Sequence, residues 1–525
     1  MPRTSYADVQ LDVETGRESD TLEPKREPVT TKPDRDTPFR ILIMGDFSGR
    51  SSRNIVTKGP RKATAIDRDS FERIFESMQV QLRIPLKDAP PLDIAFREFD
   101  DFHPDRLYQN LPLFAKLRQL RDDLDDSDRF REIARDLGIA ASVPQATQPA
   151  PPPPPPPAAS AMGGLLGGSL LEQAMEATET RSPGAAPARP SSDPLQQYIK
   201  ALVTPHLTPK PDPKRGEVIK QVDGAIGGVM RSLLHHSSFQ ELEANWRALY
   251  FLVRELETSP LLKVFLLDIS REELDADLAS ADDLRGTAMY KLLVEQTVRT
   301  PGAHPWAVVI GALTFGPGME DLNLLGRLGL LARQAGAPLI AGGSPLLAGC
   351  DSFAATPYPE DWNAATDREG WDLIRSLPEA KYIGLVAPRF MVRRPYGKTS
   401  ESTEAFEFEE FDGKPGEKPN HEHFLWANPA YLCACLLGQS FAENGWSFDP
   451  NEFLNIRGLP HFIYSDNGEP AMTPPGEVTL TQTAMDKIMD CGLMVLMSYA
   501  SGEQVRLAGF RSVAHGPAGL SARWG

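Results

Sequence analysis

The chain has 525 residues, of which 41% are hydrophobic, and a formal net charge of −17. Its length suits two or three domains, and its acidic balance disfavours binding to nucleic acid or to an anionic membrane. Apolar runs fall short of the roughly 18–20 residues of a membrane span, and the first 36 residues lack an apolar signal core. We therefore predict a cytoplasmic protein with no nucleic-acid partner and no membrane insertion.

Residues 1–36 combine one predicted strand with a long charged stretch. Val9, Leu11 and Val13 alternate with polar residues, as in a strand with one buried face. The charged residues that follow tether this strand loosely, so it can pair with a sheet outside its own domain. We predict an N-terminal strand-exchange segment at Val9, Leu11 and Val13, attached to a flexible arm.

Residues 37–140 show an alternation of strand and helix patterns. Residues 39–44 predict a buried strand, 71–78 an amphipathic helix, 92–96 an alternating strand, and 107–120 a helix with an apolar stripe. This order predicts a small α/β domain.

Residues 141–192 have the composition of a linker. Seven consecutive prolines at residues 151–157 predict a stiff polyproline II spacer. A proline run can also be a ligand for an aromatic groove, but the sequence shows no such domain. We therefore interpret this segment as a joint between two modules.

A short amphipathic helix is predicted inside the linker, at residues 169–178. Ser169 and Glu172 have the spacing of a capping box. Such a tethered helix suits docking to a partner, and folding back onto its own domain is an equal alternative. The apolar face of this helix consists of Leu170, Leu171 and Met175.

Residues 193–525 predict a larger domain with βαβ-like units. An apolar stripe over residues 239–253 includes Trp246, which we expect in the core. Ser270 and Glu273 form a predicted capping box. Further strands are expected at residues 262–269, 307–313 and 338–341, a helix directly after Ser270, a helix at 321–334, and a helix between strands at 478–513. The fold class predicted for the whole chain is α/β, mixed α+β: two modules with mixed sheets flanked by helices, joined by the proline-rich linker.

A glycine-bearing loop, Gly45-Asp46-Phe47-Ser48-Gly49-Arg50, follows the first buried strand. It departs from a phosphate-binding P-loop, because the glycines are four apart, arginine replaces lysine, and Asp46 would repel phosphates. We interpret Gly45 as the residue that permits a sharp exit from the strand, and Asp46 as an acceptor for loop amides. A soluble α/β nucleotide-binding enzyme that uses this loop is the alternative from a different class.

The sequence offers weak signals for other chemistry. His421-Glu422-His423 has the wrong spacing for metal ligands on a helix, although on a strand the two histidines would share a face. Four cysteines are too few for a disulfide framework and predict buried, reduced thiols: Cys350, Cys433, Cys435 and Cys491. We predict no catalytic, cofactor-binding or metal site, no cofactor and no enzymatic activity.

A basic cluster precedes an acidic stretch near residue 400. Such a pattern is expected where copies of a protein meet, and a locally paired surface would give the same pattern. The candidates for contacts between subunits are Arg389, Arg393, Arg394, Glu407, Glu409 and Glu410.

Several sequence blocks resemble the sheath of the bacterial type VI secretion system. Those similar to its small subunit are residues 40–49 (RILIMGDFSG), 66–69 (IDRD) and 101–105 (DFHPD). Those similar to its large subunit are residues 239–250 (FQELEANWRALY), 344–346, 351–353, 382–385, 388–390, 394–397 and 424–428. The blocks occur in the family's order, so the chain resembles a fusion of two subunits that are usually separate.

The resemblance implies a non-enzymatic structural protein that assembles helically around an inner tube by strand exchange. It implies other sheath subunits and the inner tube protein as partners, together with the baseplate and, at the helix 169–178, a sheath-disassembly ATPase. Gly311-Ala312-Leu313 lacks the acid that the family has after this strand, and relative to the family the large-subunit part lacks a C-terminal domain of about 50–100 residues. An accessory or terminator that caps the sheath is therefore a second interpretation.

Overall fold

The computed structural model describes most of the chain outside the N-terminal arm and the linker. The described residues are 33–57, 59–86, 90–126, 129–130, 132–133, 194–204, 215–281, 283–362, 368–411, 413, 418–499 and 502–524. The predicted strand 9–13, the proline run 151–157 and the predicted helix 169–178 lie outside these ranges. Within the described ranges, every helix is too short or too polar to span a bilayer.

A nine-stranded mixed sheet organises the larger of two compact units, which consists of Met1–Leu86, Pro91–Leu111 and Gly227–Gly525. The strand order is β11-β15-β14-β8-β7-β6-β1-β5-β2, parallel from β14 to β5 and antiparallel at both edges. The strands are β1 (Phe39–Gly45), β2 (Thr64–Ile66), β5 (Leu262–Asp268), β6 (Val308–Phe315), β7 (Leu339–Gly343), β8 (Ile383–Ala387), β11 (Asn455–Arg457), β14 (Leu493–Ser498) and β15 (Gln504–Leu507). The predicted mixed α/β class is confirmed.

Strand β1 lies inside this sheet and joins the two sequence segments. Ile41 pairs with Val264 of β5 on one side and with Val308 of β6 on the other. All residues of β1 except Arg40 are buried, as expected for a parallel strand covered on both faces. The first segment therefore completes the main sheet of the second, and the two share one core. The predicted domain boundaries at residues 140 and 192 lie outside the described residues.

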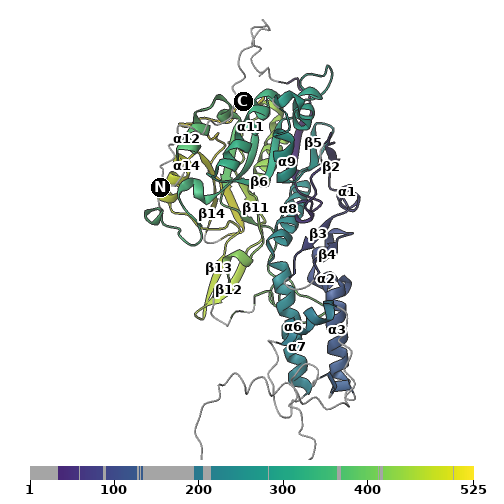
Figure 1. Ribbon diagram of the computed structural model, residues 1–525. Helices are drawn as coiled ribbons and strands as arrows, with labels where there is room; N and C mark the ends of the chain where they lie inside the picture. Colours follow the sequence, from purple (N-terminus) through teal and green to yellow (C-terminus); the bar gives the residue numbers. More distant parts are fainter. Residues whose placement is uncertain are drawn as a thin grey trace, which may run out of the picture. The chain divides into compact units, whose positions relative to one another are not determined.

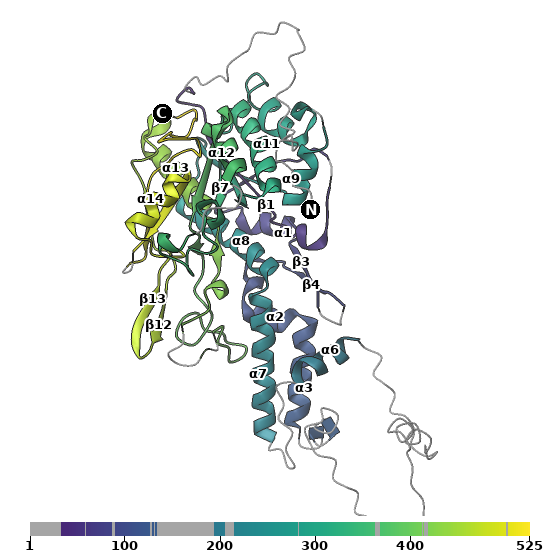
Figure 2. The ribbon, with the colours of Figure 1, turned by 60° about the vertical axis from the view of Figure 1, so that its left-hand side comes forward.

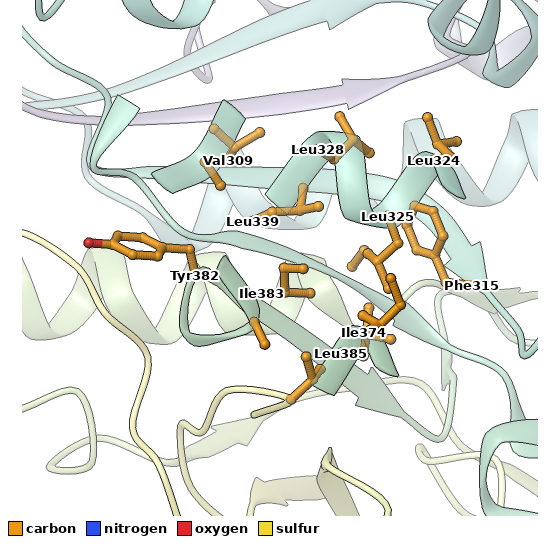
Figure 3. Close-up of a cluster of buried hydrophobic side chains, with 14 of the residues drawn as sticks. Val309, Phe315, Leu324, Leu325, Leu328, Leu339, Ile374, Tyr382, Ile383 and Leu385 are labelled. Atoms are coloured by element: carbon orange, nitrogen blue, oxygen red, sulfur yellow. The ribbon is translucent and has the colours of Figure 1, made fainter. Parts of the chain in front are cut away.

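Helices cover both faces of the sheet (Figures 1 and 2). On one face, alternate strand residues such as Leu42, Leu339 and Leu385 pack into a large apolar cluster with α9, α11, α12 and α14. Figure 3 shows the part of this cluster in which side chains of β6, β7 and β8 meet those of α11 and α12. On the other face, α13 packs against β1, β6 and β7 and is itself contacted by α8. These helices are α8 (Ser237–Glu255), α9 (Arg271–Leu278), α11 (Met319–Ala335), α12 (Arg368–Ser376), α13 (Ala430–Asn444) and α14 (Gln482–Asp490).

The predicted helix over residues 107–120 is two helices. Helix α2 (Pro104–Asn110) ends before Leu111, and α3 (Pro112–Asp125) begins directly after it. Leu111 has φ −79° and ψ 132°, an extended conformation. The ring of Pro112 disfavours the helical conformation at residue 111, and this ends the first helix. The apolar stripe continues into the second helix, so the periodicity of apolar residues does not reveal the break.

The smaller compact unit consists of Lys87–Pro90 and Pro112–Ile226. Its described part contains α3, α6 (Pro194–Val203) and the first part of α7 (Arg215–Leu234). Helices α3 and α6 are in contact, and Leu113, Phe114 and Leu117 of α3 are buried. Arg121 of α3 forms an ion pair with Asp223 of α7 at 2.6 Å, although both side chains are well exposed, so this pair contributes little.

Short elements complete the larger unit. Three two-stranded sheets are formed by β3 (Gln81–Ile84) with β4 (Leu92–Ala95), β9 (Phe390–Met391) with β10 (Trp426–Ala427), and β12 (Phe462–Asp466) with β13 (Glu469–Thr473). The remaining helices with α geometry among the described residues are α1 (Phe71–Ser77) and α10 (Ala288–Tyr290). The hairpin of β12 and β13 turns at Asn467 and Gly468, both with positive φ, as the two-residue type I′ turn requires.

Trp246 of α8 is fully buried and connects the second segment to the first. Its indole N–H donates a hydrogen bond to the carbonyl oxygen of Phe47 at 2.7 Å. Its ring lies edge-on to Phe47, Phe71 and Phe75, with centroid distances of 5.4, 5.7 and 4.6 Å. The prediction that Trp246 belongs to the core is confirmed.

We expect Trp246→Ala to lower the free energy of unfolding by about 3–5 kcal/mol, because it leaves a cavity and an unpaired carbonyl. Trp246→Phe, which keeps a ring but removes the N–H donor, should cost less. Urea unfolding followed by circular dichroism measures both. A negligible loss in the alanine variant would contradict the role of Trp246 as the link between the segments.

Candidate functional site

The loop after β1 is where a nucleotide would bind if the sheet served an enzyme, since ligands of α/β sheets lie at the carboxyl ends of the strands. Its amides are already bound by carboxylates of the chain. The N–H groups of residues 50 and 51 donate to Asp46, each at 2.8 Å. Those of residues 47 and 48 donate to Asp268 at 2.9 and 3.0 Å. The prediction that Asp46 accepts loop amides is confirmed, and the two carboxylates occupy the place that a P-loop offers to phosphate.

Gly45 and Gly49 have different structural roles, which the sequence pattern alone did not distinguish. Gly45 is the last residue of β1, and a Cβ on it would lie 2.8 Å from Cβ of Ala312 in β6. Glycine at position 45 therefore permits close approach of a neighbouring strand, and the prediction of a sharp exit there is wrong. The tight bend belongs to Gly49, which has φ +73° and would place a Cβ 1.9 Å from the carbonyl oxygen of Gln81.

Glu273 binds this loop to the second segment. The predicted capping box is confirmed, since Ser270 and Glu273 exchange hydrogen bonds between side chain and backbone N–H at the start of α9. The carboxylate also forms ion pairs with Arg50 at 2.9 Å and Arg61 at 2.7 Å. Burial alone would raise the pKa of Glu273, but hydrogen bonds from Arg50, the Thr57 N–H and Arg61 lower it to about 2.

A buried charged core lies between α8 and the segment after β9. Arg393 donates to both carboxylate oxygens of Glu410 at 2.7 and 3.0 Å, and its Nε donates to Glu243 at 2.9 Å. The side chains of both glutamates have no exposed surface, and that of Arg393 is 6% exposed. Burial opposes the charge of Arg393, but the two glutamates raise its pKa well above its usual value. Arg393 and Glu410, predicted as candidates for contacts between copies, thus pair with each other inside one chain.

The charged core continues through Arg247 and Tyr396. Arg247, one turn after Glu243 on α8, donates to Glu243 at 2.7 Å and to the Tyr396 hydroxyl at 3.0 Å. The guanidinium of Arg393 lies 4.4 Å from the centre of the Tyr396 ring. Burial raises the pKa of Tyr396 to about 12, so this hydroxyl stays protonated. We call the set Glu243, Arg247, Arg393, Tyr396 and Glu410 the charged core.

The other predicted electrostatic residues lie nearer the surface. Arg389 pairs with Glu477 at 2.6 Å and with Glu422 at 3.2 Å. Arg394, Glu407 and Glu409 are exposed. Lys398 reaches Glu407 at 3.5 Å, a surface pair of little energetic weight. A role of the exposed residues between copies stays a prediction.

Three potential metal ligands lie close together near His421-Glu422-His423, but they are not the three residues of that motif. Residues 421–423 form a 3-10 turn, so the two histidines do not share a face as on a strand. His423 stacks on His235 at 3.9 Å, whereas His421, Glu422 and Glu477 bring potential ligand atoms within 4.8 Å of one another. Arg389 binds both carboxylates of this trio, so a guanidinium supplies the positive charge that a metal ion would bring.

Three acidic residues of these sites escaped sequence reasoning: Glu243, Asp268 and Glu477. Each is an acid whose partner is remote in sequence, such as Arg393, 150 positions from Glu243. The sole local signal was the Glu243–Arg247 spacing of four on a predicted helix. The four cysteines are buried and unpaired, which confirms the prediction of buried, reduced thiols.

We expect Arg393→Met to lower the free energy of unfolding by about 3–5 kcal/mol, because it leaves Glu243 and Glu410 buried without their cation. The matched control is Arg394→Met on the exposed neighbour, expected to change stability by less than about 0.5 kcal/mol. Urea denaturation of both variants at neutral pH provides the test. Equal losses would show that the buried pairing does not stabilise the fold.

The pKa values of Glu273, Glu410 and Glu477 are each lowered from 4.5 to about 2 in the folded chain. Each group therefore contributes stability that is fully present above pH 4.5 and is lost as the pH falls toward 2. We expect Glu477→Gln to be destabilised at neutral pH and to lose less additional stability between pH 4.5 and 2 than the parent. Denaturant unfolding across this range, with Glu407→Gln as the exposed control, measures the effect. Parallel pH profiles for parent and Glu477→Gln would contradict it.

Comparison with known proteins identifies the chain's relatives. Residues 216–514 match the VipB family, described as EvpB/VC_A0108, tail sheath N-terminal domain. Residues 25–132 match the family described as type VI secretion system, VipA, VC_A0107 or Hcp2. The type VI secretion system sheath protein TssC1 of Pseudomonas aeruginosa is 29% identical over 309 residues, which is 56% of this chain and 60% of that relative. The VipB match covers more than half of this chain's residues. The chain therefore belongs to the type VI secretion tail-sheath family, and it combines regions of both the VipA and VipB types.

Proposed function

We propose that the chain is a structural subunit of the type VI contractile sheath, assembling helically around the inner tube without catalysing a reaction. The observation that carries this proposal is the position of β1, which comes from the VipA-like region and pairs with β5 and β6 of the VipB-like region. One chain thus contributes strands from both kinds of sheath region to the same nine-stranded sheet. Family membership implies interaction with other sheath subunits.

The internal contacts of this unit support a mechanical role. A subunit that transmits force between neighbours must keep its shape, and close-packed interiors deform little. Trp246, Glu273 and the charged core each connect segments that lie far apart in sequence. We infer that these contacts hold the unit together as a body while the surfaces between subunits rearrange.

The loop after β1 supports a structural role over the nucleotide-binding alternative. Asp46 and Asp268 hold the four amides that a phosphate would need, and both carboxylates would repel it. Among the described residues, the acidic and basic groups at the ends of β1 and β8 are bound to each other, as in Arg50–Glu273 and Arg389–Glu477. Charged groups that are already paired with each other favour a role in packing over a role in binding and converting a substrate.

The finer parts of the proposal rest on segments outside the described residues. We propose that Val9, Leu11 and Val13 form the strand donated to a neighbouring subunit, and that Leu170, Leu171 and Met175 form the face offered to the disassembly ATPase. The inner tube and baseplate are the further proposed partners, and the cytoplasm is the proposed compartment. The alternating pattern of the first segment and the capping box of the second support these assignments.

Electron microscopy of the purified chain, alone and with separate sheath subunits, tests the proposed function. Helical tubules that incorporate the chain are the expected result. Discrete particles bound at sheath ends would favour the accessory or terminator, which caps rather than builds the sheath. A monodisperse protein that binds ATP tightly and joins no sheath would contradict the proposal.

We expect deletion of residues 1–16 to weaken polymerisation and to leave the melting temperature unchanged, because the described core begins after this segment. Substitution of Val9, Leu11 and Val13 by serine should act in the same way. Substitution of Gln10 and Asp12, on the opposite face of the predicted strand, is the matched control and should polymerise normally. Pelleting and electron microscopy give the readout, and unimpaired assembly of the deleted chain would exclude strand donation from this end.

A further inference from the structure

A cavity lies beside the charged core, within the larger compact unit. Its volume is about 480 Å³, which is in the range of small-molecule sites. Its walls come from the turn before α2, from α8, from the segment after β9, and from the loops before β12 and β15. The charged core therefore has one side that faces open space, and the groups on that side can meet a ligand.

Arg247 lines this cavity and keeps N–H groups that the chain itself does not use. A guanidinium has five N–H groups. The Nε–H of Arg247 donates to Glu243, and one Nη2–H donates to the Tyr396 hydroxyl. Among the described residues, no acceptor binds the other three, and the side chain is 21% exposed. A guanidinium held in this way is suited to a carboxylate, which can accept two of its N–H groups.

His103, which also lines the cavity, adds a further donor. Its Nδ1 accepts the backbone N–H of Asp105 at 3.2 Å, so the proton of the neutral ring is on Nε2. Burial lowers the pKa of His103, and Arg247 lowers it further against the opposite effect of Asp105, so the ring is neutral at pH 7. The ring stands edge-on to Tyr396, with centroids 4.9 Å apart. Both His103 and Arg247 thus contact Tyr396 and offer donors to one anionic group.

The rim of the cavity has the opposite charge. Asp100, Glu401 and Glu503 line it and are exposed. Arg394 is an exposed cation beside these three carboxylates. A ligand with several negative charges, such as phosphate, would be repelled at this rim, whereas an ammonium group would be attracted. The cavity therefore suits a ligand that carries one carboxylate and one cationic group.

Apolar side chains complete the walls of the cavity. Phe99, Val392, Leu459 and Pro460 are among them. The ring of Phe99 also lies against the Arg247 guanidinium, 5.4 Å from its centre. Walls of this kind favour a ligand with a hydrocarbon part beside its charged groups.

We propose that this cavity binds a small zwitterion, an α-amino acid with an apolar side chain. The carboxylate accepts from Arg247 and His103, the ammonium group lies toward the rim carboxylates, and the side chain contacts Phe99 and Leu459. All these residues belong to one chain, so the proposal does not depend on sheath assembly. The ligand would connect the turn before α2 with α8 and the loop before β12.

Isothermal titration calorimetry of the purified full-length chain tests the proposal. The probes are leucine and phenylalanine, their analogues without the ammonium group (isocaproate and hydrocinnamate), and their analogues without the carboxylate (isoamylamine and phenethylamine). We expect saturable binding of the amino acids at one site per chain, and affinities at least about tenfold lower for the analogues, the effect of losing one charged hydrogen-bond partner. Absence of saturable binding for both amino acids overturns the proposal. Binding of phosphate or of isocaproate as tightly as leucine does so as well.

Variants of the inner wall test the carboxylate end of the site. His103→Phe keeps a ring against Tyr396 and removes the Nε2–H, and Arg247→Gln removes the guanidinium. Each should weaken leucine and isocaproate about tenfold and leave isoamylamine unchanged, with ligand-detected NMR as the readout for the weaker analogues. His515→Phe, on an exposed histidine outside the cavity, is the matched control and should bind leucine normally.

A triple variant of the rim tests the ammonium end. Asp100→Asn, Glu401→Gln and Glu503→Gln together should weaken leucine and isoamylamine about tenfold, because about three exposed ion pairs are lost, and should not weaken isocaproate. Glu469→Gln, on an exposed glutamate outside the cavity, is the control.

Melting temperatures show whether each variant is folded. If Arg247→Gln unfolds because the charged core is broken, His103→Phe and the rim variant still decide the question, since their side chains lie outside that core. Equal losses for leucine, isocaproate and isoamylamine in a folded variant would mean that the charges do not recognise the two ends of the ligand, and this overturns the proposal. Unchanged leucine affinity in both His103→Phe and the rim variant overturns it too.

Discussion

The structure depends on one constraint: an internal strand of the main sheet comes from the other end of the chain. β1 pairs with β5 and β6 over most of its length, so the second segment has no continuous sheet without it. Trp246 and Glu273 reinforce the same junction, one through the Phe47 carbonyl and the other through Arg50 and Arg61. A central parallel strand is buried on both faces, so its removal would expose apolar surface that no other described element covers.

The charges of the chain divide into an inner and an outer population. Inside, acids and bases are paired closely enough to hold the pKa values of Glu273, Glu410 and Glu477 near 2. A buried pair is costly to break, because removal of one partner leaves the other as an unpaired buried charge. Over the whole sequence, acidic residues exceed basic ones and give the net charge of −17.

The paired charges and apolar packing of the interior therefore fix the arrangement of the segments, whereas exposed strand edges are available for contacts with partners. In the described residues, the ends of the central strands carry satisfied carboxylates and guanidinium groups, an arrangement suited to packing. The β12 edge, in contrast, exposes backbone groups and an isoleucine. A protein with a closed interior and open strand edges is suited to polymerisation, because main-chain hydrogen bonds between subunits add affinity without requiring a change in the core.

Local patterns in the sequence indicated strands such as 39–44 and 262–269, the burial of Trp246, the capping box at Ser270 and the amide-accepting role of Asp46, because each depends on spacing within a few residues. Periodicity missed the break at Leu111, which follows from the next residue being proline. Tertiary structure alone decided that β1 enters the sheet of the other segment, that Gly45 makes room for Ala312, and that Arg393 pairs inward with Glu243 and Glu410. In these three cases the contacting residues are between 17 and 267 positions apart in the sequence. The position of a charged residue or a glycine along the chain does not specify which distant segment the fold places next to it.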